Sequence, residues 1–135
     1  MPPGKVRESH RIRLERDQAQ MLAHKLPEAR KDLEGLVEEL KADPAQDSQL
    51  LAEARSALAN AQYYMTWLMR LEGQPREEWE PEIEAARQTY RLLAEQADDR
   101  GDGEAGRHCR EDLESAVRLA RMDLSDLQGL PLPSQ

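Results

Sequence analysis

Apolar residues recur at alternating spacings of four and three along three segments of the chain, and this pattern limits the possible folds more than any other feature. Such spacing keeps the apolar side chains on one face of an α-helix, where neighbouring helices can cover them. The segments and their apolar stripes are 47–72 (Leu50, Ala54, Ala57, Ala61, Tyr64, Leu68 and Leu71), 80–98 (Trp79, Ile83, Ala86, Tyr90, Leu93 and Ala97) and 103–128 (Cys109, Leu113, Val117, Ala120, Leu124 and Leu127). The pattern predicts three long amphipathic helices.

Two further helices are expected before these three. Residues 28–42 carry a fourth apolar stripe, formed by Ala29, Leu33, Leu36 and Leu40 with Val37 beside it, and Asp43-Pro44 ends this segment. Residues 4–25 also favour a helix, but the half from Arg7 to Arg16 is nearly all charged and gains little from burial. Phe is absent and aromatic residues make up only 4 % of the chain, a composition that suits a sheet poorly.

These segments together predict an all-α fold, a single antiparallel bundle of four core helices with a polar N-terminal helical arm. The connections between the helices are short, which favours antiparallel neighbours. We expect the charged arm at 1–26, the bundle at 27–129 and a Pro-containing tail at 130–135. The expected core consists of Leu36, Leu40, Leu58, Leu68, Leu93, Leu113 and Leu124.

Charge is distributed unevenly along the chain. The net charge is −8, yet residues 1–31 hold eight Lys and Arg against four Asp and Glu, which leaves −12 on the remainder. An acidic body argues against wrapping a nucleic-acid backbone, which requires a basic groove. A helical subunit of a nucleic-acid-associated complex is therefore the alternative function, and it would use the basic residues of the arm: Lys5, Arg7, Arg11, Arg13 and Arg16.

The sequence favours a cytoplasmic protein that does not enter a membrane. Cys109 is the only cysteine, so no intrachain disulfide can form and a reducing compartment is the simpler interpretation. The longest run without a charged residue spans the 14 residues from Ser56 to Met69. A membrane-spanning helix needs about 20 apolar residues. The N-terminal residues contain no apolar segment typical of a signal peptide.

No motif predicts a catalytic, cofactor or metal site. The loop from Asp98 to Gly103 resembles the start of a calcium-binding loop, but Arg100 and Cys109 stand where acidic ligands belong. We therefore expect a polar turn in which Asp102 caps the following helix. Cys109 lacks further ligands and is expected to pack as a small apolar residue. Glu34 and Glu38 share a helix face, but no second carboxylate pair accompanies them, so a metal-dependent hydrolase is disfavoured.

Part of the 80–98 segment resembles a known family. Ala86, Tyr90 and Leu93, following the Gly73 turn, are similar to the second helix of a tetratricopeptide repeat, in which a small residue precedes an aromatic one by four positions. Thr66 stands where that family has a small residue in the preceding helix, and no period of roughly 34 residues follows. The resemblance covers one helix, and stacked helical hairpins remain an alternative to a closed bundle.

Tyr63 and Trp67 form the candidate partner-binding site. They are four residues apart, on a flank of the 47–72 segment that lies outside its apolar stripe, and Tyr and Trp are enriched at binding hot spots. The alternative is that the tail residues Leu130 to Pro133 cover them. The resulting hypothesis is a non-enzymatic helical protein–protein interaction or adaptor module, whose partner is another protein or a second copy of this chain.

Overall fold

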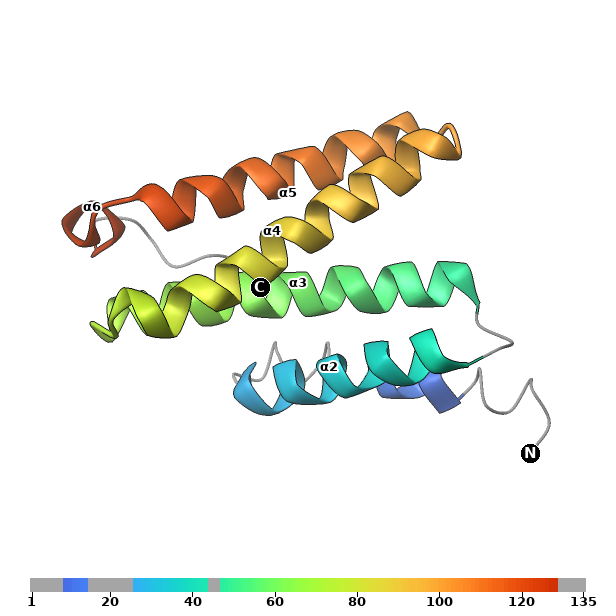
Figure 1. Ribbon diagram of the computed structural model, residues 1–135, viewed down its shortest axis with the longest axis horizontal. Helices are drawn as coiled ribbons and strands as arrows, with labels where there is room; N and C mark the ends of the chain where they lie inside the picture. The colour runs from blue at the N-terminus through green and yellow to red at the C-terminus, as the bar shows by residue number, and fades with distance from the viewer. Residues whose placement is uncertain (1–8, 15–25, 44–46, 129–135) are drawn as a thin grey trace. The chain divides into compact units, whose positions relative to one another are not determined.

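The computed structural model describes residues 9–14, 26–43 and 47–128, and throughout these ranges the chain forms only helices and the turns between them. The helices are α2 (Leu26–Ala42), α3 (Ser48–Leu71), α4 (Arg76–Asp99), α5 (Gly103–Arg121) and α6 (Leu124–Gln128), and residues 9–14 are helical as well (Figure 1). The predicted fold class, an all-α helical bundle, is confirmed. The predicted tail at 130–135 lies outside the described residues.

Two predicted helix limits are wrong. α4 begins at Arg76 rather than 80, directly after Pro75, whose extended backbone (φ −69°, ψ 159°) ends the preceding loop. The predicted helix at 103–128 is two helices, because Met122 adopts an extended conformation (φ −70°, ψ 140°) after the end of α5. Asp123, a residue type favoured just before a helix, then precedes α6.

The chain divides into two compact units, and the boundary falls inside α3, between Ala61 and Gln62. In the first unit, α2 and the first half of α3 run antiparallel (Figure 1). Every residue of the predicted stripes in these two segments is buried: Ala29, Leu33, Leu36, Val37 and Leu40 in α2, and Leu50, Ala54, Ala57 and Ala61 in α3; Leu26, Leu51 and Ala59 are buried as well. The apolar periodicity therefore predicted this core correctly.

Residues 9–14 also belong to the packed part of the first unit. Leu14 is only 1 % exposed, and Arg11 forms an ion pair with Glu53 of α3. Arg13 makes a wider set of contacts: its Nε donates to both carboxylate oxygens of Asp32 at 3.0 and 2.9 Å, and its Nη1 donates to both oxygens of Glu39 at 2.8 Å. The expectation that this charged segment gains little from burial is therefore wrong for residues 9–14.

Gly35 provides the space that Arg13 occupies over α2. The Arg13 Nη2 donates to the backbone carbonyl of Asp32 at 3.2 Å. A Cβ atom at position 35 would lie 3.2 Å from that same Nη2, which is tight for a carbon contact. The bidentate contacts to Asp32 raise the pKa of Arg13 further, so the guanidinium stays charged at any accessible pH.

In the second unit, α4 and α5 form an antiparallel hairpin (Figure 1). Asp102 caps α5 as predicted, since its Oδ1 accepts from the backbone N–H of Ala105 at 3.1 Å. Near this turn the helices come close at Gly106, where an added Cβ would lie 2.5 Å from Asp98 Oδ1. The buried apolar residues of the hairpin include Trp79, Ile83, Ala86, Tyr90, Leu93, Ala97, Ala116 and Leu119.

The buried face of α3 changes between the two units, and the sequence analysis missed this change. Beyond Ala61 the predicted stripe continues through Leu68, but Leu68 is 38 % exposed. Gln62, Thr66 and Arg70, spaced by four, are buried instead. Leu124, another predicted core residue, is 40 % exposed, because α6 is a separate helix that buries Leu127.

The turn between α3 and α4 yields a stability prediction. Gly73 has a φ of +76°, a conformation that costs an L-residue about 1–2 kcal/mol. We expect Gly73→Ala to lower the free energy of unfolding by about 1 kcal/mol, as measured by urea denaturation followed by circular dichroism. Gly103→Ala is the matched control, because Gly103 begins α5 with open space around it and no positive φ. Equal effects of the two substitutions would contradict the assigned turn geometry.

Candidate functional site

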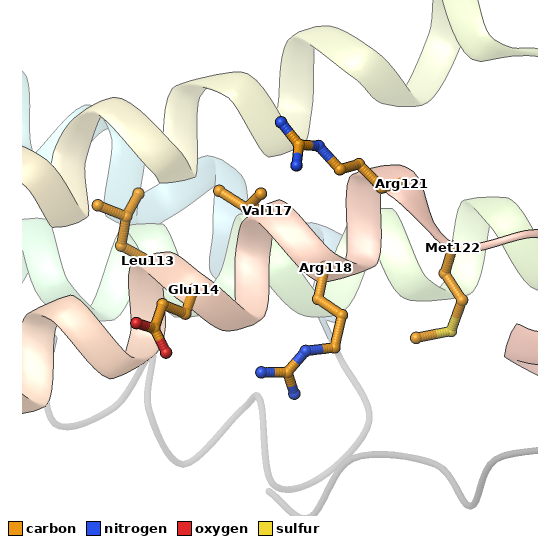
Figure 2. A pocket seen from close by; sticks show the side chains of 6 residues that line it. All are labelled: Leu113, Glu114, Val117, Arg118, Arg121 and Met122. Atoms are coloured by element: carbon orange, nitrogen blue, oxygen red, sulfur yellow. The ribbon is translucent and has the colours of Figure 1, made fainter.

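An open groove of about 610 Å³ runs along the C-terminal half of α5. Among the described residues it is lined by Leu113, Glu114, Val117, Arg118, Arg121 and Met122, and we call this surface the α5 groove. Figure 2 shows Leu113, Val117 and Arg121 on one side of the helix axis and Glu114, Arg118 and Met122 on the other. Each row has a spacing of four residues, so the groove lies between two ridges of the helix surface.

The α5 groove is apolar at one end and cationic at the other. Leu113 and Val117 are half-buried, whereas Arg118 and Arg121 are exposed in the last turn of α5. Cations in this position complement the negative end of the helix dipole, which explains why the helix tolerates two of them. Within the ranges 9–14, 26–43 and 47–128, neither guanidinium pairs with a carboxylate, whereas Arg107 and Arg110 of the same helix both do.

Three tyrosines, Tyr63, Tyr64 and Tyr90, lie in the second unit, to which the groove also belongs. The rings of Tyr63 and Tyr64 meet edge to face, with centroids 5.6 Å apart. Burial is the largest cause that raises the pKa of all three tyrosines, and the negative charge of Asp112 on α5 raises each pKa further. For Tyr63, the positive charge of Arg118 offsets part of this rise in pKa.

The pKa values of this tyrosine cluster and of Cys109 do not favour nucleophilic catalysis. Burial is the largest cause that raises the pKa of each tyrosine, of Cys109 and of Asp112. A nucleophilic cysteine or tyrosine requires the opposite shift, which stabilises its anion at neutral pH. Asp112 also raises the pKa of Cys109, so that thiol remains protonated. Cys109 is half-buried, and its predicted packing role stays a prediction.

The two predicted partner-binding aromatics lie in different environments. Tyr63 and Trp67 are neighbours, with ring centroids 6.2 Å apart, but Trp67 is only 7 % exposed whereas Tyr63 is half-buried. Trp67 is adjacent to Thr66 on the buried face of the second half of α3, which explains its burial. Tyr63 is therefore the member of the pair that a partner can reach. The alternative cover, the tail, lies outside the described residues.

The basic arm is partly neutralised by the chain itself. Arg11 and Arg13 pair with Glu53, Asp32 and Glu39, as described above. Lys5, Arg7 and Arg16 lie outside the described residues. The sequence analysis counted these side chains as one basic patch, but two of the five already have carboxylate partners on α2 and α3.

The acidic residues considered as metal ligands are engaged in other contacts. Glu34 pairs with Arg30 at 2.7 Å, and Glu38 with Lys41 at 3.5 Å. In the described part of the chain, no group of three or more His, Cys, Asp or Glu side chains is arranged to hold a metal ion. The same part of the chain contains no helix that is long and apolar enough to cross a membrane.

Two features of the second unit escaped the sequence analysis. Leu113 and Val117 were assigned to the core and Arg118 to no site, although the spacing of four from Leu113 to Val117 to Arg121, and from Arg118 to Met122, was visible in the sequence. The burial of Arg70 could not be predicted from the neighbouring sequence, because its partners lie elsewhere in the chain. They are the carbonyl of Leu119, at 2.7 Å, and the ring of Trp79, at 4.6 Å.

Comparisons of the chain with protein-family models, with curated proteins and with solved structures found no match. The similarity of Ala86, Tyr90 and Leu93 to one helix of a tetratricopeptide repeat therefore rests on those residues alone.

Proposed function

We propose that this protein is a non-enzymatic helical interaction module whose contact surface is the α5 groove. The observation that carries the proposal is the combination, in one concave surface, of half-buried apolar side chains with two arginines that lack carboxylate partners among the described residues. Protein interfaces combine an apolar centre with polar rims, and Arg and Tyr are enriched at their hot spots. Half-buried Tyr63, in the same unit, is a further aromatic residue that a partner can reach.

The alternative functions have less support. The raised pKa values of Cys109 and Tyr90 do not favour nucleophilic catalysis, which requires a stabilised anion. A nucleic-acid contact through the arm would have to compete with the carboxylates that pair with Arg11 and Arg13. The acidic composition of residues 32–135 adds repulsion toward phosphate.

Photo-crosslinking tests the proposed contact surface. A benzophenone amino acid at position 117, inside the groove, is expected to give a specific cross-linked protein in the native host. The same amino acid at position 95, an exposed site on α4 outside the groove, is the matched control. Once purified, the captured protein should bind the unmodified chain, and Arg118→Glu should weaken this binding about tenfold, or 1.4 kcal/mol.

Equal labelling from positions 117 and 95 would overturn the proposal. Unchanged binding of the purified partner to the Arg118→Glu variant would overturn it as well. Circular dichroism of the variant checks that the exposed substitution leaves the helices intact.

A further inference from the structure

The shape of the α5 groove restricts what can fill it. Among the described residues, its lining consists of two rows of side chains spaced by four residues on one helix, 113–117–121 and 114–118–122 (Figure 2). A groove between such rows accepts the ridge of a second helix, which is the commonest way in which helices pack. An extended peptide would instead require a free strand edge or a ring-lined trough, and the described residues contain no strand.

The charges of the groove define the direction of that helix. Arg118 and Arg121 stand at the C-terminal end of α5, and Leu113 stands toward its middle. A helix favours acidic residues in its own first turn, where the dipole is positive. When that first turn meets the two arginines, the incoming helix runs antiparallel to α5. In this orientation the positive end of each helix dipole lies beside the negative end of the other, which is a favourable interaction.

We infer that the α5 groove binds an amphipathic helix of a partner protein, antiparallel to α5, with an acidic first turn on Arg118 and Arg121 and apolar residues over Leu113 and Val117. This inference rests on the proposed function and adds the class and orientation of the partner. α4 shows the same kind of helix in this chain: its first turn holds Glu77 and Glu78, and its apolar face is buried. A second copy of the chain is therefore one competing occupant.

The test uses three synthetic helical peptides and the full-length chain. The first peptide carries Leu at i, i+4 and i+8 with Asp and Glu in its first turn. The second has the acidic residues moved to its last turn, and the third has them replaced by Lys. Binding is followed by NMR of the ¹⁵N-labelled protein, with a spin label at the N-terminus of each peptide.

We expect only the first peptide to perturb residues 113–122 at micromolar concentration, with the spin label broadening Met122 more than Leu113. Arg118→Glu should weaken this binding about tenfold and allow the Lys peptide to bind. Arg91→Glu, an equal charge change at an exposed site on α4, should leave both affinities unchanged. Equal binding of the first two peptides, or no perturbation of the groove by the first, would overturn the inference.

Two further measurements separate the competing occupants. If Leu130→Glu/Leu132→Glu strengthens peptide binding about tenfold, the chain's own tail fills the groove and the inference fails. If the groove resonances shift with protein concentration alone, a second copy fills it and the inference also fails. The photo-crosslinking at position 117 is independent of these results: a captured protein that contacts the groove without an acidic helix would leave the proposed function intact and remove only this inference.

Discussion

Replacement of Leu119 by Ala is expected to lower the free energy of unfolding by about 2–5 kcal/mol, the usual cost of removing a large side chain from a packed core. Leu119 lies in α5 and is only 1 % exposed, so neighbouring atoms surround the deleted carbons. The measurement is urea denaturation followed by helical circular dichroism at constant pH.

Leu68→Ala is the matched control for Leu119→Ala. It makes the same chemical change in the same unit, but at a side chain that is 38 % exposed. Surface substitutions usually change stability by less than about 0.5 kcal/mol, and Ala is also the best helix former. If Leu68→Ala costs as much as Leu119→Ala, the sequence-based core that includes Leu68 is right and the assigned face of α3 is wrong.

Arg70→Met is expected to cost about 2–3 kcal/mol, because the buried guanidinium of Arg70 serves as the C-terminal cap of another helix. Its Nη1 donates to the carbonyl of Leu119, one of the last carbonyls of α5, at 2.7 Å. Its charge also stands 4.6 Å above the ring of Trp79. Methionine fills a similar volume, so the lost free energy of unfolding reflects the missing hydrogen bond and charge rather than a cavity.

Arg76→Met is the control for Arg70→Met. The guanidinium of Arg76 contacts the same ring, at 5.1 Å, but the side chain is 65 % exposed and its ion pair with Glu80 joins residues one helical turn apart. Such exposed pairs contribute about 0.3–0.5 kcal/mol. The loss of unfolding free energy for Arg70→Lys should lie between those for Arg70→Met and Arg76→Met, because Lys keeps the charge but lacks the planar stacking group. Equal losses for Arg70→Met and Arg76→Met would contradict the capping role.

The buried residues were predictable wherever the same face of a helix stays buried along its length, so that one continuous apolar stripe marks it. In α2 and the first half of α3, every residue of the predicted stripes is buried, including Leu36 and Leu50. The prediction failed at Leu68 because a stripe extrapolated along α3 assumes that one face is buried over the whole helix. The change of face after Ala61 coincides with the tertiary contacts of Arg70 with Leu119 and Trp79, which no apolar periodicity in the sequence predicts.

The candidate site was predictable only in part, for the same reason. Tyr63 was identified from its residue type and its position off the predicted stripe, and that reasoning applied equally to Trp67, which is buried. The α5 groove requires knowledge of which residues of 113–122 are left uncovered, and this depends on how the hairpin packs. The partners of Arg11 and Arg13 are likewise distant in sequence, so a count of charges could not find them.

The contact of Arg13 with Gly35 has a consequence for how this protein can vary. The two positions limit each other's side-chain size, because a Cβ atom at position 35 would lie 3.2 Å from the Arg13 Nη2. A homologous chain can therefore accept Ala or a larger residue at 35 most readily where position 13 is no longer Arg, and the loss of Arg13 removes its ion pairs with Asp32 and Glu39. Natural variation at positions 13, 32, 35 and 39 is thus expected to occur in concert rather than site by site.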